Sequence, residues 1–298
     1  LASLIGLMLG LGAAYLLDFL DDTVKTADDV TGGFKRPVLG AVPSIGKPKD
    51  PYPSRLAVTK ASPSAALEAF RVLRTNLQFA SVDTPARSIM VTSAKPLEGK
   101  SVVTANLAVS LAQNGRSVIL VDADLRRPRQ NRVFEVPNDI GLSTVLGNVD
   151  ARVEDYLVQS KVDPNLRILP AGPIPPNPPE LLGSKRMKGL VEQLAGMADI
   201  VVYDTLPIAE LADAASLGGH MDGAIFVMRS QRTRRGAAHR ALDVLERANI
   251  RILGVVLNGM PLSRGGSYYH YYGRESGSGR KSSRSKPKQG IDAAPAAP

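Results

Sequence analysis

The chain has 298 residues, of which 44% are hydrophobic and 22% are charged, so it can bury a sizeable core and is not a mainly disordered protein. It has no cysteine and three scattered histidines, which excludes thiolate catalysis, disulfide scaffolds and sulfur-bound zinc and argues against a histidine-rich metal site. The formal net charge is +9. Carboxylates, lysines, hydroxyls, backbone amides and a metal such as Mg²⁺ therefore remain available for chemistry.

Residues 1–20 are predicted to form a transmembrane helix. No charged side chain occurs between Leu1 and Leu17, and Asp18 ends the apolar run. The run is slightly shorter than the roughly 20 apolar residues that span a bilayer, and a buried core helix is the alternative. Gly6 and Gly10 have the GxxxG spacing of helices packed in lipid, although the match can arise by chance. Because the chain does not begin with Met, we expect a fragment with an upstream part removed.

Residues 21–60 are rich in Pro, Gly, Asp and Lys, and we interpret them as a juxtamembrane linker with short strand pieces. A helix is predicted to follow, capped by Ser62 or Ser64. Four apolar residues recur after these caps at helical spacing: Leu67, Phe70, Leu73 and Leu77.

Residues 87–260 alternate short apolar runs with amphipathic stretches. Six runs are rich in Val and Ile and do not alternate with polar residues: RSIMVTS, SVILVDAD, LRILPAG, DIVVYDT, GAIFVMRS and ILGVVLN. Strands buried on both faces have this composition, so we predict an α/β fold with a mostly parallel sheet and helices on both faces. Ligands in such sheets bind at the carboxyl ends of the strands.

Residues 263–298 are predicted to be a disordered basic tail. Residues 264–298 hold seven Lys or Arg against two acidic residues, so the excess charge of the chain lies largely there. No nucleic-acid-binding motif accompanies this charge, and we expect no nucleic-acid partner.

The segment SAKPLEGKS (93–101) follows the predicted strand 88–92 and precedes a predicted helix. Gly-Lys-Ser at a helix start is typical of a P-loop, in which backbone N–H groups surround phosphate oxygens. Lys100 would reach the β- and γ-phosphates and Ser101 would hold Mg²⁺. Ala94 stands where the P-loop pattern has its first Gly, and a capped helix with a stray lysine is the alternative. The residues assigned to ATP binding in this segment are Ala94, Lys95, Pro96, Leu97, Glu98, Gly99, Lys100, Ser101 and Val102.

Two other predicted strands end in carboxylates. Asp122 and Asp124 lie two residues apart in SVILVDADLRRP, and Asp204 closes DIVVYDTLP in the manner of a Walker B motif. Carboxylates gathered at one sheet edge repel one another unless a cation or a proton lies between them. Three strand ends would thus offer a lysine, a hydroxyl and three carboxylates to one Mg·ATP, whereas the alternative for residues 122–127 is a solvated turn of charges.

The segments EGKS, VILVDADLRRP and DIVVYDTLP resemble the Walker A, A′ and B motifs of the bacterial tyrosine kinases, which are the cytoplasmic kinase domains of capsule and exopolysaccharide co-polymerases. GLSTVL, LPAGPIPPNPPELL and LGVVLN agree with this family as well. The resemblance covers essentially the whole chain, and residues 1–20 resemble the last membrane helix of a Wzz-type chain-length domain. It implies a MinD/ParA-related P-loop kinase domain over residues 61–262.

The resemblance also implies roles for the residues of the site. Lys100 and Mg²⁺ would stabilise the transferred phosphoryl group, and Asp122 would orient the acceptor phenol or accept its proton. Asp124 would support the metal or the substrate, and Asn258 would read adenine as the matching residue does in relatives. The predicted Mg²⁺ ligands are Ser101, Asp122 and Asp204.

Two features separate this family from the MinD and ParA ATPases. One is ALEAFRVLR, in which Glu68, Arg71 and Arg74 match the ExxRxxR motif through which such kinases pack into rings. The alternative for that motif is an ordinary surface ion pair. The other is SYYHYYG, whose four tyrosines are predicted phosphoacceptors on a tail that can reach a neighbour's active site: Tyr268, Tyr269, Tyr271 and Tyr272. A sticky low-complexity segment is the alternative for this cluster.

Two residues of the P-loop depart from a simple match. Lys95 stands five positions before Lys100, where MinD-type ATPases carry a signature lysine, so it is either a second lysine near the phosphates or an exposed one. Leu97 replaces the Gly that many related kinases have before Glu98.

The predicted function is an ATP-dependent tyrosine autokinase that regulates exopolysaccharide polymerisation and export. The expected partners are further copies of the chain in a ring, the membrane, the polysaccharide machinery and a cognate tyrosine phosphatase. The expected location is the inner (plasma) membrane, with the kinase domain on the cytoplasmic side. Two other functions stay open: a MinD/ParA-like membrane-associated ATPase switch, in which water attacks the phosphate, and a non-catalytic regulator of polysaccharide chain length.

Overall fold

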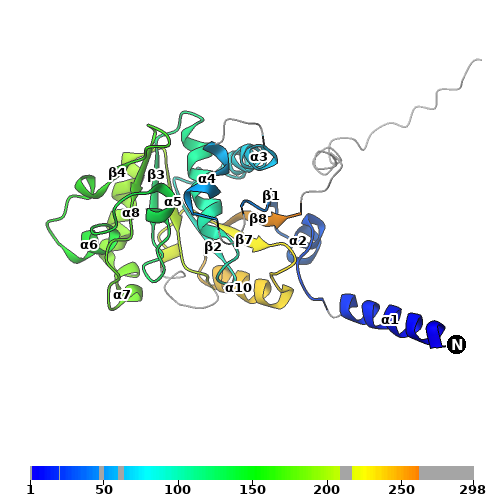
Figure 1. The fold of residues 1–298 in the computed structure, drawn as a ribbon. Helices are drawn as coiled ribbons and strands as arrows, with labels where there is room; N and C mark the ends of the chain where they lie inside the picture. Colours follow the sequence, from blue (N-terminus) through cyan, green and yellow to red (C-terminus); the bar gives the residue numbers. More distant parts are fainter. Residues whose placement is uncertain (1, 20, 47–49, 60–63, 209–216, 262–298) are drawn as a thin grey trace, which may run out of the picture. The chain divides into compact units, whose positions relative to one another are not determined.

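The computed structural model describes residues 2–19, 21–46, 50–59, 64–208 and 217–261 (Figure 1). Its strands are β1 (Val38–Pro43), β2 (Ser88–Ser93), β3 (Val118–Asp122), β4 (Val158–Gln159), β5 (Leu166–Leu169), β6 (Ile200–Asp204), β7 (Gly223–Arg229) and β8 (Ile252–Met260). Its α-helices are α1 (Ala2–Phe19), α2 (Ala27–Phe34), α3 (Ala65–Ala80), α4 (Lys100–Ala112), α5 (Gln130–Phe134), α6 (Leu142–Gly147), α7 (Pro178–Leu182), α8 (Lys185–Met197) and α10 (Arg235–Arg247). The described residues also contain three short 3₁₀ helices: η1 (Pro53–Arg55), η2 (Ala57–Thr59) and η3 (Val153–Tyr156).

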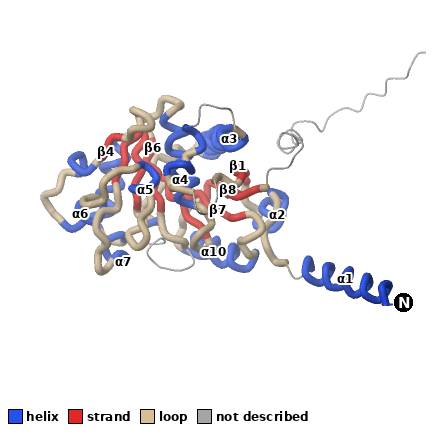
Figure 2. Tube along the Cα trace, in the orientation of Figure 1, coloured by secondary structure: helices blue, strands red, loops and turns tan. Residues whose placement is uncertain are grey.

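Within the described residues the strands form one eight-stranded sheet in the order β1-β8-β7-β2-β6-β3-β5-β4. Neighbouring strands run parallel, except that β4 is antiparallel to β5. The six predicted apolar runs contain β2, β3, β5, β6, β7 and β8, so the predicted parallel sheet is confirmed. Their side chains are almost all buried because helices cover both faces (Figure 2).

Successive residues of a strand face opposite sides of the sheet, and this alternation divides the core. Ile89 and Val91 of β2 pack with α3, α4 and α5 on one face. Met90, between them, packs with α2 and α10 on the other face. On that second face, Ile119 and Val121 of β3 pack with α6, α7 and α8.

The segment interpreted as a linker, residues 21–60, contributes to this core. Its strand β1 pairs in parallel with β8 and forms an edge of the sheet. Val24 is fully buried, and its N–H donates a hydrogen bond to the carbonyl of Thr233 at 2.9 Å. The predicted strand pieces are therefore part of the sheet, and the compact unit takes in residues that precede position 61.

Helix α3 has the predicted cap and core face. The Ser64 side chain accepts a hydrogen bond from the N–H of Leu67 at 3.1 Å, whereas Ser62 lies outside the described residues. Phe70, Leu73 and Leu77 are buried, as their spacing predicts.

The transmembrane helix predicted over residues 1–20 is not shown by the structure. A helix is present there, but no helix in the described part of the chain is long and apolar enough to cross a membrane. Helix α1 has 18 residues and includes Asp18.

Candidate active site

The three predicted strand ends lie side by side, because β6 is hydrogen-bonded between β2 and β3. Asp122 at the end of β3 pairs in register with Asp204 at the end of β6. The loop after β2 leads into α4, whose first residue is Lys100. The parallel sheet thereby brings together at one edge the lysine and the carboxylates that the sequence analysis singled out.

Lys100 lies at the centre of these groups. Its Nζ is 3.0 Å from Oδ2 of Asp124 and 3.2 Å from Oδ1 of Asp204. It is also 3.4 Å from Oγ of Ser101. Only 8% of Lys100 is exposed, and burial alone would lower the pKa of its ammonium, but the charges of Asp204 and Asp124 outweigh burial and raise that pKa. The lysine is therefore firmly protonated.

Asp122, at the end of β3, is fully buried. Its Oδ2 accepts hydrogen bonds from the backbone N–H groups of Arg129 at 2.9 Å and Gln130 at 2.8 Å, and its Oδ1 accepts one from that of Asp124 at 3.3 Å. Burial and the nearby charge of Asp204 raise the pKa of Asp122 to about 7 despite these donors. One lysine cannot neutralise three carboxylates, so a proton or a further cation would relieve their repulsion.

Gln130 is a site residue that the sequence analysis missed. Its Nε2 donates hydrogen bonds to Oδ2 of Asp204 at 2.8 Å and to the carbonyl of Ser101 at 3.1 Å. Its Oε1 is buried without a hydrogen-bond partner. The only sequence signal for this role was its place soon after Asp122 and Asp124, because the contact joins the first residue of α5 to the end of β6.

The residues present fit a hydrated Mg²⁺ beside a nucleotide phosphate better than a metal held by protein alone. In the described residues, no group of three or more His, Cys, Asp or Glu side chains is arranged to hold a metal ion. Mg²⁺ usually keeps several waters and takes one or two carboxylates plus phosphate oxygens. The Ser101 hydroxyl, the carboxylate of Asp122 or Asp204 and the orphaned Oε1 of Gln130 are oxygen donors of the kind it prefers.

The phosphate loop itself is held by contacts from its neighbours. Nδ2 of Asn258, at the carboxyl end of β8, donates a hydrogen bond to the carbonyl of Glu98 at 2.9 Å. Gly99 has φ +90°, and a Cβ there would lie 2.0 Å from that Nδ2. Asn258, predicted to read adenine, thus has its amide nitrogen engaged with the loop, and only glycine fits at position 99. Ala94 at the start of the loop is fully buried, while the Lys95 side chain is exposed.

Leu97, at the tip of the loop, has φ +66° and is 85% exposed. A side chain in this left-handed region costs about 1–2 kcal/mol. We expect Leu97→Gly to raise the free energy of unfolding by about 0.5–1 kcal/mol, the relief being partly offset by the greater freedom of glycine in the unfolded chain. Urea unfolding of the variant measures this change. Leu97→Ala is the control, since it keeps a Cβ and should gain nothing; equal stability of the Ala and Gly variants would contradict the strain.

The three residues of the ExxRxxR motif on α3 make two different kinds of contact. Arg71 and Glu68 form an exposed ion pair at 3.5 Å. Arg74 donates a hydrogen bond from Nη1 to the carbonyl of Ser110 in α4 at 3.0 Å, and burial lowers the pKa of its guanidinium, helped by Arg71. Glu68 and Arg71 are therefore the members of the motif that face solvent in a single chain.

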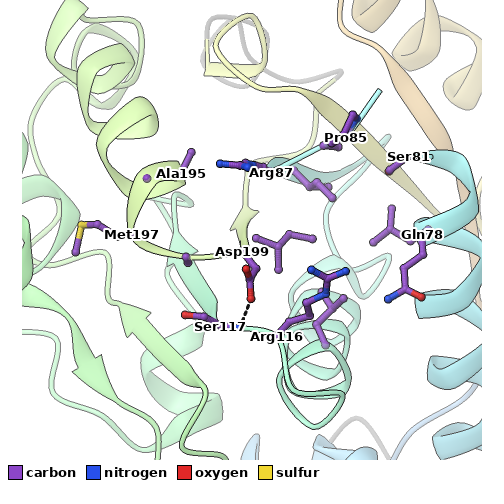
Figure 3. A pocket seen from close by; sticks show the side chains of 16 residues that line it. Gln78, Ser81, Pro85, Arg87, Arg116, Ser117, Ala195, Met197 and Asp199 are labelled. Atoms are coloured by element: carbon purple, nitrogen blue, oxygen red, sulfur yellow. Dashed lines mark hydrogen bonds between the residues drawn. The ribbon is translucent and has the colours of Figure 1, made fainter. Parts of the chain in front are cut away.

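A cavity of about 600 Å³ lies at the other edge of the sheet, by the amino ends of β2, β3 and β6 (Figure 3). The C-terminal ends of α3, α4 and α8 border it, and Arg87 and Arg116 line it. Cations favour the negative end of a helix, so these arginines offset the charge of the three helix ends. The cavity is separate from the phosphate loop, which lies at the carboxyl edge.

The predicted phosphoacceptors Tyr268, Tyr269, Tyr271 and Tyr272 lie outside the described residues. Their relation to the site therefore stays a prediction.

Comparison with known proteins agrees with the motifs. Residues 89–264 match the family described as CobQ/CobB/MinD/ParA nucleotide binding domain. Tyrosine-protein kinase YwqD of Bacillus subtilis is 44% identical over 206 residues, which cover 69% of this chain and 86% of YwqD. The putative tyrosine-protein kinase CapB of Staphylococcus aureus is 35% identical over 212 residues, which cover 71% of this chain and 92% of CapB.

Among solved structures, the kinase domain of Escherichia coli tyrosine kinase Etk superposes with a TM-score of 0.73 at 28% identity, over 82% of this chain and 98% of that domain. The family match covers more than half of the chain, and the relatives match over most of their own length. The resemblance drawn from the three strand-end motifs is confirmed. The chain belongs to the CobQ/CobB/MinD/ParA nucleotide-binding family and, within it, to the bacterial tyrosine-protein kinases.

Proposed function

We propose that the chain is an ATP-dependent autokinase that transfers the γ-phosphoryl group of ATP to tyrosines of its own C-terminal cluster. The observation that carries this proposal is the position of Lys100, whose ammonium lies within 3.2 Å of carboxylates from two different strand ends. A buried cation next to a phosphate loop is suited to phosphoryl transfer, because catalysis of that reaction consists mostly of positioning the reactants and stabilising charge.

In this proposal Lys100 moves its interaction from Asp124 and Asp204 to the phosphate oxygens as the nucleotide binds. Asp122, whose pKa is raised to about 7, accepts the proton of the attacking phenol or orients its hydroxyl. The backbone N–H groups of residues 97–101 would surround the phosphates. Magnesium, held by Ser101 with Asp122 or Asp204, would add positive charge to the transferred group.

The acceptor tyrosine would come from a neighbouring copy of the chain in a ring. Glu68 and Arg71 form an exposed pair on α3 and are free to exchange partners with a second copy. The described chain ends at Pro261, directly after β8, and the carboxyl end of β8 lies at the same end of the parallel sheet as the phosphate loop. Each phosphorylated tyrosine would carry about −1.5 to −2 charge, so modified tails would be repelled by the carboxylates and release the ring.

We further propose that the kinase regulates exopolysaccharide polymerisation and export from the cytoplasmic face of the inner (plasma) membrane. The resemblance to co-polymerase kinase domains supports this setting, with the polysaccharide machinery and a cognate tyrosine phosphatase as partners. Fractionation of cells that express the chain measures the location: recovery with the membrane supports it, and recovery only in the soluble fraction contradicts it.

Replacing the four tail tyrosines Tyr268, Tyr269, Tyr271 and Tyr272 with Phe is expected to remove most phosphotyrosine while leaving nucleotide binding unchanged. Phe keeps the aromatic ring and lacks the hydroxyl that accepts the phosphoryl group. The measurement is incubation with γ-labelled ATP followed by mass spectrometry of the chain, with Tyr156→Phe as a control elsewhere in the fold. Undiminished phosphotyrosine in the four-fold variant would make the acceptor assignment wrong. Label released only as free phosphate would instead support a MinD/ParA-like ATPase switch.

A further inference from the structure

The carboxylate of Glu98 lies inside the phosphate loop but is turned away from solvent. The residue is only 4% exposed. Its Oε2 accepts a hydrogen bond from the backbone N–H of Lys95 at 2.9 Å, which ties the two sides of the loop tip together. Its Oε1 accepts a hydrogen bond from the hydroxyl of Thr233, a residue of the turn between β7 and α10 that is 1% exposed.

Thr233 is itself held by the end of β7. The backbone N–H of Arg229 donates to Oγ1 of Thr233 at 2.7 Å. The hydroxyl therefore accepts from Arg229 and donates its own proton to the carboxylate of Glu98, which in its ionised form can only accept. The carbonyl of Glu98 is also bound by Asn258, so the side chain of this residue attaches the loop to the turn after β7 and its backbone attaches the loop to β8.

A buried carboxylate next to a triphosphate site needs compensation. Burial raises the pKa of Glu98, and the hydrogen bonds from Thr233 and Lys95 only partly offset it. The charge would oppose a polyanionic ligand if it faced the phosphates. Both carboxylate oxygens instead accept hydrogen bonds from fixed donors, the N–H of Lys95 and the hydroxyl of Thr233. The ammonium of Lys100 pairs with Asp124 and Asp204.

We infer that Glu98 is a positioning residue that holds the phosphate loop in its nucleotide-binding shape through the contact of its carboxylate with Thr233 and with the N–H of Lys95. It does not touch the nucleotide. The inference rests on the proposed function only in that residues 93–101 bind a nucleotide. Without these two contacts of Glu98, the loop also adopts other conformations. The apparent affinity for the nucleotide then falls in proportion to the fraction of molecules whose loop has the nucleotide-binding conformation.

The test is binding of ADP to the whole chain by titration calorimetry. Glu98→Ala removes both contacts and is expected to weaken ADP binding about tenfold or more. Thr233→Val removes only the hydroxyl and should weaken it several-fold, whereas Thr233→Ser keeps the hydroxyl and should bind like the wild type. Glu98→Gln should be intermediate, because its carbonyl can still accept from Thr233 while its NH₂ group faces the N–H of Lys95. Glu192→Gln on α8 and Thr31→Val on α2 are matched controls.

Two further measurements separate positioning from general stability. Amide hydrogen exchange at residues 94–99 without nucleotide should accelerate in Glu98→Ala and Thr233→Val and stay unchanged in the controls. In phosphorylation assays the KM for ATP should rise more than kcat falls. The inference would be overturned if Glu98→Ala and Thr233→Val both bound ADP with wild-type affinity. It would also be overturned if Thr233→Ser bound ADP as weakly as Thr233→Val. If Glu98→Ala does not fold, the Val and Ser variants at position 233 decide it.

The readout keeps the inference distinct from the kinase proposal. If ADP binding depends on Glu98 but no tyrosine becomes phosphorylated, the proposed kinase function is contradicted and the positioning role of Glu98 is supported. If tyrosine phosphorylation is normal but ADP binding does not depend on Glu98, the kinase function is supported and the positioning role is contradicted.

Discussion

Lys100→Met is expected to lower tyrosine phosphorylation by at least about 100-fold and to weaken nucleotide binding strongly. Charge stabilisation of the transferred group by one preorganised cation is worth about that much, and methionine supplies none. The change also leaves Asp122, Asp124 and Asp204 without their shared ammonium. Removing one partner of a buried ion pair is costly, so the free energy of unfolding at pH 7 should fall by about 3 kcal/mol, less whatever proton uptake by the carboxylates recovers.

Mass spectrometry of the purified chain after incubation with Mg·ATP gives the first quantity, and urea unfolding gives the second. Lys188→Met, on the exposed side of α8, is the matched control and should change neither. Lys95→Met tests whether the exposed second lysine contributes as a signature lysine. Full phosphotyrosine in Lys100→Met, in a folded chain, would make the assignment of this lysine wrong.

Asp122 is expected to give the kinase a pH dependence centred near pH 7. Its ionised form accepts the phenol proton or holds the metal, so kcat/KM should rise with pH through about 7, the pKa of the group in the free protein. The measurement is the initial rate of phosphorylation between pH 5.5 and 8.5. Asp122→Asn should remove both the activity and its pH dependence, and Asp150→Asn, at an exposed position, should keep both. A flat wild-type profile would contradict the shifted carboxyl.

The same shift makes an opposite prediction for stability. The pKa of Asp122 is higher in the folded protein, about 7, than its ordinary value of 3.8, so between these pH values the folded protein holds a proton that the unfolded chain has lost. The unfolding free energy contributed by this group therefore falls as pH rises from about 4 to about 7 and then levels off. Urea unfolding without nucleotide at pH 5 and pH 8 should show a larger loss for the wild type than for Asp122→Asn.

Much of the fold was predictable because its strands are buried on both faces and so are recognisable from composition alone. The runs that contain β2, β3 and β6 end in the chemically distinctive residues of the site, and parallel strands bring such ends to one edge. Segments without that composition were harder to place. Strand β1 lies in a Pro- and Gly-rich stretch, and its membership of the sheet depends on β8, more than 200 residues later.

The polar contacts within the site were also not predictable from the sequence. Gln130 meets Asp204, Asn258 meets Glu98, and Thr233 meets Glu98, each across a long separation in the chain. No local pattern distinguishes these polar residues from solvated ones. The left-handed backbone of Leu97 is likewise invisible in a sequence that places leucine where glycine is favoured.

The amino-acid sequence by itself determined the sheet class, the phosphate loop and the identity of the three carboxylates, because hydrophobic runs and the residues that end them are local properties of the chain. Only the tertiary structure decided which carboxyl group has a raised pKa, which side chains hold the loop, and which arginine of the α3 motif is already bound to α4. Those outcomes depend on burial and on hydrogen bonds between strands and turns that come together only when the sheet has formed.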